Sequence, residues 1–339
     1  MVKLSVLDQS PVRAGGEPRQ ALEETIALAQ ATEKLGYDRY WLAEHHGTAG
    51  FAGSSPEILI TRVAAATKRI RVGSGGVMLS HYSPLKVAEN FKLLENLYPG
   101  RIDLGIGRAP GSDGLTAAAL AYGSEIGIEY FPTKIADMMA FLADEPPVTE
   151  PFKQVRATPA ISEMPEVWLL GSSDQSASYA AHFGLAFSFA HFIAPEACAP
   201  VLDYYRRNFK PSESLAEPKV SAAIFVICAD TAEEAEYLAA SRDLWRLKLQ
   251  YGQHLPYPSP EEALAYPYNE QEKRIVAANK ANRFTGDAAS LYDRLLAFAE
   301  DSGLDELVVL TITHDFEKRM RSYELLANVF ELGKREQAA

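Results

Sequence analysis

The chain has 339 residues, of which 47% are hydrophobic and 23% are charged. This composition is typical of soluble globular proteins and excludes a disordered or fibrous chain. Lysine and arginine together number 33 against 45 aspartates and glutamates, which gives a net charge of −12. Because this balance lacks the positive field that attracts a phosphate backbone, we expect no nucleic acid partner.

The cysteines and the distribution of apolar residues indicate where in the cell the protein is located. Cys198 and Cys228 each lie in an apolar run; two such residues make neither a disulfide framework nor a zinc site, which predicts a cytoplasmic protein. The first residues include Asp8, Arg13 and Glu17, where a signal peptide would be apolar. No run approaches the roughly 18 apolar residues of a membrane span, so we expect no membrane association.

Eight apolar runs have the character of parallel strands that are covered on both faces. They are Lys3–Leu7, Arg39–Ala43, Arg71–Leu79, Ile102–Ile106, Val167–Leu170, Ala186–Phe192, Val220–Cys228 and Leu307–Ile312. Helical patterns follow nearly every run, at 22–36, from Ser55-Pro56, from Ser83-Pro84, and at 174–183, 195–207, 231–248, 286–302 and 315–331. Alternating strands and helices of this number predict an α/β fold, a (β/α)₈ TIM barrel, with a doubly wound open sheet as the alternative.

We expect one barrel domain over residues 1–335. Proline-rich stretches predict insertions within it, after the fourth and seventh strands, at approximately 110–165 and 250–285. Their aromatic residues are candidates for a closing lid, although such residues can equally serve for packing. The aromatic residues of the second insertion are Tyr251, Tyr257, Tyr266, Tyr268 and Phe284.

In a (β/α)₈ barrel the chemistry lies where the strands end, so the residues that follow each run are the site candidates. After the fifth run, Gly171-Ser172-Ser173 opens a helical pattern that contains Ser176. A helix start offers free N–H groups, and two hydroxyls three residues apart can donate to one anion. Arg108, at the end of the adjacent fourth run, would add a guanidinium. These residues predict a phosphate site.

A simpler interpretation of the same residues stays open. Ser172 or Ser173 could do no more than cap the helix, since serine is a common helix cap. Arg108 could pair with a carboxylate such as Asp103 or Asp113. Under this interpretation the strand end carries no ligand.

Glycines interrupt the third run at Gly73, Gly75 and Gly76. Inside a strand, glycine marks either a bulge or the close approach of another backbone or a flat ligand. A planar ring could therefore lie against this strand, and a bulge that shapes the barrel rim is the alternative.

Glu44-His45-His46 follows the second run. Since successive side chains of a strand point to opposite sides, we expect only one histidine to face the barrel mouth. A neutral imidazole there could act as a general base, and a histidine satisfied by the loop backbone is the alternative. A metal site is not expected because HExxH is absent. The nucleophile elbow, the Walker sequence and the dinucleotide fingerprint are absent as well.

Four blocks in order resemble the bacterial luciferase-like flavin monooxygenase family, closest to its non-luminescent single-gene branch. They are WLAEHH at 41–46, VGSGGVMLSHYSPLKVAE at 72–89, LYPGRIDLGIGRAPGSD at 97–113 and VWLLGSSDQSASYAAHFGL at 167–185. Two positions depart from the luciferases themselves: Gly107 stands where they have a cysteine, and Ser172 where they have an acidic residue. Light emission and a long-chain aldehyde substrate are therefore not expected.

The resemblance implies a barrel that binds reduced FMN at its mouth. Arg108, Ser173 and Ser176, with the Gly171-Ser172 turn, would hold the phosphate. Gly75 and Gly76 would form a cis peptide under the flavin ring, and His45 would be the catalytic base.

The resemblance also implies the reaction and the partners. The protein would be a two-component monooxygenase that uses O₂ on a small organic substrate, and a separate flavin reductase would supply the reduced FMN. Two alternatives are hydride transfer with the deazaflavin F420 and a flavin-binding protein without turnover. Members of the family dimerise through the helices at about 55–68 and 84–97, so we expect a homodimer.

Overall fold

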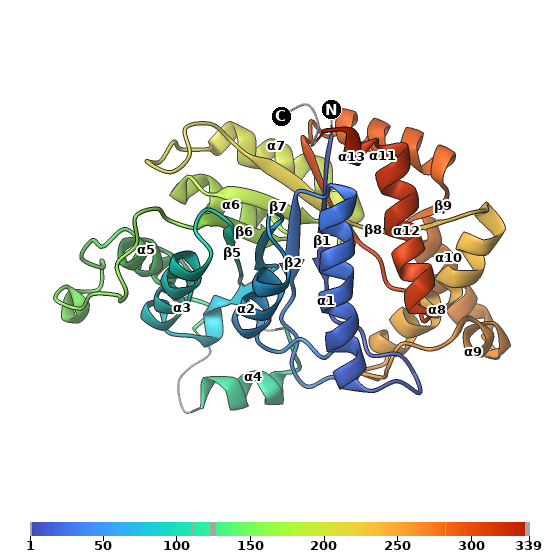
Figure 1. The fold of residues 1–339 in the computed structure, drawn as a ribbon. Coiled ribbons are helices and arrows are strands. Elements are labelled where there is room, and N and C mark those ends of the chain that lie inside the picture. The colour runs from blue at the N-terminus through green and yellow to red at the C-terminus, as the bar shows by residue number, and fades with distance from the viewer. Residues whose placement is uncertain (1, 110, 123–126, 282, 336–339) are drawn as a thin grey trace.

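The computed structural model of the protein describes residues 2–109, 111–122, 127–281 and 283–335, with parallel strands at the centre and helices around them (Figure 1). The strands are β1 (Lys3–Asp8), β2 (Arg39–Leu42), β3 (Arg71–Ser74), β4 (Val77–Met78), β5 (Ile102–Gly107), β6 (Glu166–Gly171), β7 (Ala186–Ala190), β8 (Val220–Ala229), β9 (Phe284–Asp287) and β10 (Glu306–Leu310). The main helices are α1 (Pro18–Leu35), α2 (Pro56–Ala66), α3 (Pro84–Leu97), α4 (Gly114–Ala121), α5 (Phe131–Leu142), α6 (Asp174–Phe183), α7 (Cys198–Asn208), α8 (Ala232–Gln250), α9 (Pro260–Ala265), α10 (Glu270–Ala281), α11 (Ala288–Asp301), α12 (Phe316–Val329) and α13 (Leu332–Arg335).

Eight of these strands close into a barrel, which confirms the predicted (β/α)₈ fold. Neighbours run in the order β10, β1, β2, β3, β5, β6, β7, β8, and β8 pairs in turn with β10. Every pairing is parallel, as it must be when a helix returns the chain after each strand. The open sheet is excluded because β10 is bonded on both of its edges.

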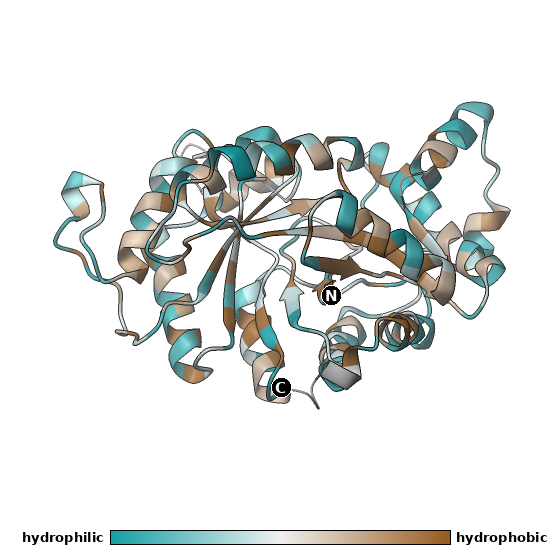
Figure 2. Ribbon diagram, turned by 90° about the horizontal axis from the view of Figure 1, so that it is seen from above, coloured by the Kyte–Doolittle hydropathy of each residue, from teal (hydrophilic) through white to brown (hydrophobic). Residues whose placement is uncertain are grey.

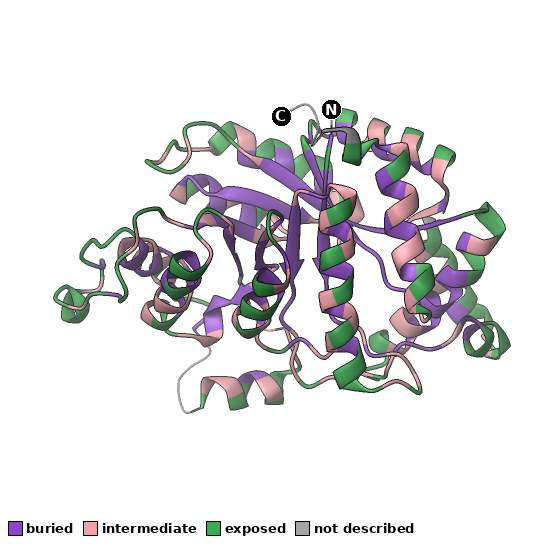
Figure 3. Ribbon diagram, in the orientation of Figure 1, coloured by how far each residue is buried: buried purple, intermediate pink, exposed green. Residues whose placement is uncertain are grey.

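Burial explains why the strands read as continuous apolar runs. The strands are brown in the hydropathy view and purple in the burial view, while the outer faces of the helices are green (Figures 2 and 3). Trp41 and Trp168 meet in the barrel interior, with their ring centroids 5.3 Å apart in an edge-to-face arrangement. A strand that is covered by helices outside and by side chains inside has no polar face to show.

The run predicted as one strand over 71–79 is two strands, and the reason lies at its glycines. The bond between Gly75 and Gly76 is cis, and the chain is divided there into β3 and β4, both of which pair with β5. A Cβ on Gly76 would lie 2.7 Å from the carbonyl oxygen of Gly105. The backbone therefore approaches β5 more closely than any side chain would allow.

β9 was not predicted as a strand, since its first two residues were assigned to the second insertion and its last two to the following helix. It exists because β8 is longer than the barrel wall. β10 pairs with β8 only over Ser221–Phe225, and the free edge beyond, from Val226 to Ala229, pairs with β9. A four-residue strand with one strongly apolar side chain has no detectable period in the sequence.

Both predicted insertions contain helices. The first includes α4 and α5, while Pro110 and residues 123–126 lie outside the described residues. The second includes α9 and α10. Tyr257 in this insertion is only 2% exposed, and its hydroxyl donates to the Ile312 carbonyl at 3.2 Å. The aromatic side chain at this position serves for packing, not as a movable cover. No helix of the described residues is long and apolar enough to cross a membrane.

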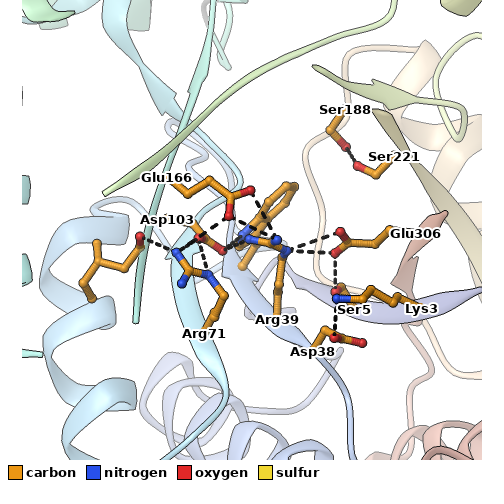
Figure 4. Close-up of polar contacts among 12 residues, drawn as sticks. Lys3, Ser5, Asp38, Arg39, Arg71, Asp103, Glu166, Ser188, Ser221 and Glu306 are labelled. Atoms are coloured by element: carbon orange, nitrogen blue, oxygen red, sulfur yellow. Dashed lines mark hydrogen bonds and ion pairs between the residues drawn. The ribbon is translucent and has the colours of Figure 1, made fainter. Parts of the chain in front are cut away.

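The amino ends of the strands are joined by a buried cluster of ion pairs, which we call the base network (Figure 4). Arg39 lies at its centre, 2.9 Å from Asp103, 3.0 Å from Glu306 and 3.2 Å from Glu166. Arg71 pairs with Asp103 as well. These residues lie at or next to the first positions of β2, β5, β6, β10 and β3, so the network closes the end of the barrel opposite its mouth.

Candidate active site

A cavity of about 480 Å³ opens where the strands end. Residues that follow β1, β2, β7 and β10 form its wall together with residues of β8 and α8. Its apolar lining includes Phe51, Phe192, Phe225, Trp245, Leu310 and Ile312, and its polar lining includes Gln9, His45, His46, Asp113, Arg242 and Arg246. A mostly apolar hollow of this size, at the carboxyl end of a (β/α)₈ barrel, has the form of a site for a small organic molecule.

His45 lies in the wall of this cavity. Its ring centroid is 4.4 Å from that of Phe51, and its buried Nδ1 has no hydrogen-bond partner among the described residues. Burial, with a smaller contribution from His46, lowers the pKa of His45 to about 4. The imidazole is therefore neutral at neutral pH.

The sequence predicted that only one of the two histidines would face the mouth, and this was wrong. β2 ends at Leu42, so the alternation of a strand no longer applies at His45, and both histidines line the cavity. His46 Nε2 lies 2.8 Å from the buried carboxylate of Glu44. Glu44 also accepts hydrogen bonds from the Tyr82 hydroxyl at 2.6 Å and from the Met78 N–H at 3.0 Å. This arrangement fixes the ring of His46, whereas His45 keeps an unpaired nitrogen.

The predicted phosphate residues lie together at the start of α6. Ser173 caps the helix, accepting from the Ser176 N–H, and the two hydroxyls are 3.2 Å apart. Arg108, at the end of β5, reaches across to bond the side chain of Gln175 in the first turn of the same helix. A Cβ on Gly171 would overlap the side chain of Ser176. The glycine therefore allows that hydroxyl to lie against the turn.

Asp103 and Asp113, the alternative partners for Arg108, are bonded to other groups. The predicted capping role of Ser173 is confirmed. Asp103 is bonded to Arg39 and Arg71 in the base network. Asp113 accepts two backbone N–H groups at the start of α4. The carboxamide oxygen of Gln175 is a neutral partner, so the positive charge of Arg108 is not balanced there. Gln175 was missed because a glutamine in a serine-rich turn carries no distinctive signal.

The cis bond between Gly75 and Gly76 lies on β3–β4, one strand away from β6. A Cβ on Gly75 would come within 2.6 Å of Leu7 and 3.0 Å of Trp41 in the barrel interior. The glycines and the phosphate residues lie on the β3 to β6 side of the mouth and do not line the cavity described above. The barrel mouth thus has two parts, with the guanidinium of Arg108 and the hydroxyls of Ser173 and Ser176 on one side and a mostly apolar cavity on the other.

Comparison with known proteins identifies the family. The family model described as luciferase-like monooxygenase matches residues 2–126 and 129–311. The chain belongs to the luciferase-like monooxygenase family. It is 47% identical over 331 residues to Uncharacterized protein YwcH of Bacillus subtilis, covering 97% of this chain and 99% of that one.

Two further members of the family match this chain over nearly their full length. N-acetyl-S-alkylcysteine monooxygenase of Bacillus subtilis is 38% identical over 338 residues, covering 99% of this chain and 100% of that protein. The crystal structure of apo-MsnO8 superposes with a TM-score of 0.90 at 38% identity, covering 98% of this chain and 99% of that one.

The cavity is also lined by residues that were not singled out in the sequence. Arg242, Trp245, Arg246 and Leu249, all on α8, line the cavity. Their spacing of three and four residues places them on one side of a helix, which is the signal that could have found them. It was hidden because α8 as a whole carries many charged residues and looks like an ordinary solvent-facing helix.

The expectation about metal ions concerned histidine and carboxylate clusters. In the parts of the chain that the structure describes, no group of three histidine, cysteine, aspartate or glutamate side chains is placed to hold a metal ion. His45 and His46 lie in the cavity wall, and His46 is bonded to Glu44.

Proposed function

We propose that this family member is a two-component monooxygenase that binds reduced FMN and uses O₂ to oxidise a small organic substrate. The observation that carries the proposal is the meeting of Arg108, Ser173 and Ser176 at the start of α6, beside a cavity that contains His45. The family to which the chain belongs supports the same chemistry. A separate flavin reductase would supply the reduced cofactor.

The residues present fit the phosphate of FMN. The guanidinium of Arg108 can donate two parallel hydrogen bonds to phosphate oxygens in place of the one it gives Gln175. The hydroxyls of Ser173 and Ser176 add two donors, and the start of α6 adds the positive end of a helix dipole. Asp174 is exposed, and its carboxylate accepts the Gln175 N–H. Its charge therefore has a partner of its own.

The flavin ring would reach from this helix toward the barrel axis, where Gly75 and Gly76 leave the backbone without side chains. When bound, reduced FMN supplies the electrons with which O₂ is activated. His45 would act as the proton donor or acceptor, because it lines the cavity and its ring is neutral at neutral pH. The aromatic and aliphatic cavity wall would keep water away from the reacting groups.

Anaerobic titration with reduced FMN and reduced riboflavin tests the proposal. We expect binding of reduced FMN in the micromolar range or tighter, weaker binding of riboflavin, and a loss of about 10- to 100-fold in FMN affinity for Arg108→Met and Ser176→Ala. Equal affinity for riboflavin would contradict the phosphate assignment. Tighter binding of reduced F420, with no oxygen uptake, would replace the proposal by hydride transfer. Flavin binding without any oxygen-dependent turnover would indicate a binding protein.

We also propose that the protein forms a homodimer through α2 and α3. Each helix exposes apolar side chains that a monomer would leave in water: Ile58 is 68% exposed, Leu93 52% and Leu97 53%. Exposed aliphatic residues on neighbouring helices are typical of an interface. Analytical ultracentrifugation at micromolar concentration should give a dimer, and a monomer would contradict this part of the proposal.

A further inference from the structure

Arg242 is a buried cation without a counter-charge. Its side chain is only 6% exposed, lines the cavity, and lies over the ring of Phe225 with its guanidinium carbon 3.7 Å from the centroid. Within the described residues, no hydrogen bond or ion pair of Arg242 is present. A guanidinium carries five N–H donors, and leaving them unpaired in an apolar wall is unfavourable.

Asp243, the next residue in the chain, and Asp113, in the cavity wall, are both committed to other partners. Asp243 bonds to Arg283, and it also lies 3.7 Å from Lys280. Asp113, in the cavity wall, caps α4. No carboxylate of the described cavity wall is therefore available to neutralise Arg242.

A second guanidinium lies one helical turn away. Arg246 lines the same cavity and donates one N–H to the Phe192 carbonyl at 2.9 Å, which leaves its other donors free to contact a ligand. Burial, and after it the charge of Arg246, lowers the pKa of Arg242 to about 9. Even so, the group is protonated at neutral pH. The cavity thus contains two positive charges on a mostly apolar surface.

We propose that this cavity binds an organic monoanion, an apolar body with one carboxylate or sulfonate group held by Arg242 with help from Arg246. The inference rests on the proposed function, in which this cavity takes the substrate. One negative charge is expected because one guanidinium is without a partner. An apolar body is expected because Phe225, Trp245 and Ile312 line the remaining wall.

The competing occupant is the phosphate of the cofactor. Phosphate monoesters are dianions near neutral pH and would suit a pair of guanidiniums. However, Arg108 and the start of α6 already offer a phosphate site on the other side of the mouth. The two assignments can be distinguished by experiment. In one, Arg108 binds the phosphate of FMN and Arg242 binds the monoanion. In the other, Arg242 binds the phosphate.

Trp245 in the cavity wall provides a binding signal that does not depend on turnover. We would titrate the flavin-free protein with octanoate, octanesulfonate, octanamide and inorganic phosphate and follow tryptophan fluorescence. A Trp245→Phe variant should abolish the change, which assigns the signal to the cavity. We expect the two monoanions to bind about 10- to 100-fold more tightly than octanamide, the range for a hydrogen-bonded charge pair.

Arginine variants then test the anchor. Arg242→Met and Arg242→Gln should bind octanoate as weakly as octanamide, whereas Arg242→Lys should keep part of the preference. Arg108→Met is the matched control: it should lose FMN affinity and keep octanoate affinity. If Arg108→Met also leaves FMN binding unchanged, the proposed function fails while the anion site stands.

Two outcomes would overturn the inference. One is equal affinity of the wild-type protein for octanoate and octanamide. The other is displacement of octanoate by FMN or inorganic phosphate together with loss of FMN binding in Arg242→Met, which would assign these arginines to the cofactor.

Discussion

Arg39 and Arg242 are the same residue type, buried to nearly the same extent at opposite ends of the barrel, with 5% and 6% of their surface exposed. In the base network, burial lowers the pKa of Arg39, but Asp103, Glu306 and Glu166 outweigh burial and raise it. At the mouth, no carboxylate of the described residues bonds to Arg242, and burial lowers its pKa to about 9.

This difference distinguishes charges that are paired within the fold from a charge that is available to a ligand. The base network satisfies its own members, so it needs no ligand and stabilises the barrel only as a complete set. At the mouth, Arg242 lines the cavity without an ion pair to any described residue, so a counter-charge would come from a bound molecule. An unpaired buried polar group is therefore a better indication of a binding site than a charge alone.

The largest effect is expected at the base network. Arg39→Met removes one cation and leaves Asp103 and Glu306 buried with fewer partners, so unfolding in urea should show a loss of about 3–5 kcal/mol. Arg19→Met is the matched control. Arg19 is an exposed arginine whose side chain is 86% accessible and pairs with Glu23, and its loss should change stability by less than about 0.5 kcal/mol. Similar losses in both variants would mean that burial of the charge is unimportant.

A smaller effect is expected for His45, and it depends on pH. Its folded pKa of about 4 lies below the usual histidine value of 6.5, so the unfolded chain binds the proton more tightly. The stability that depends on the neutral ring is therefore complete above about pH 7 and is lost as pH falls from about 6.5 toward 4, by roughly 1–3 kcal/mol.

Urea unfolding of the wild type and of His45→Gln at pH 7.5 and pH 5 checks this window. His191, whose pKa burial also lowers to about 4, contributes equally to both proteins, so the difference between them isolates His45. A difference that is the same at the two pH values would show that His45 is not neutralised by burial.

The smallest effect, and one of opposite sign, is expected for Arg242→Met. Removing an unpaired buried charge and keeping an apolar chain of similar length should leave stability unchanged or raise it by about 1 kcal/mol. Arg246→Met, which removes the donor to the Phe192 carbonyl, should instead cost about 1 kcal/mol. If Arg242→Met lowers the free energy of unfolding by several kcal/mol in thermal and urea unfolding, Arg242 stabilises the fold as the base network does, and the prediction is wrong.

Much of the fold was accessible from the sequence because strand and helix periods are local. Each barrel strand coincides with an apolar run, and Gly36, Ser83 and Pro84 mark helix ends as expected. The third run and β9 were the failures. The division at Gly75-Gly76 and the pairing of β9 depend on what lies beside the backbone, which a local pattern does not contain.

The candidate site was accessible only in part. Arg108, Ser173 and Ser176 could be named because strand ends and helix starts are visible in the chain, and the structure brings them together. Their role toward FMN stays a prediction, as does that of His45. The cavity-facing arginines of α8 could not be named, because one face of a charged helix is distinguished from another only by what it packs against.

The sequence by itself determined the alternation of strand and helix, the closure expected of eight such units, and the strand ends where polar residues collect, since these follow from spacing along the chain. Only the tertiary structure decided which charges are satisfied. Arg39 finds carboxylates from strands distant in sequence, while Arg242 finds none. Whether a buried charge is paired depends on neighbours in space, and those neighbours are set by the closed barrel, not by the residues beside it in the chain.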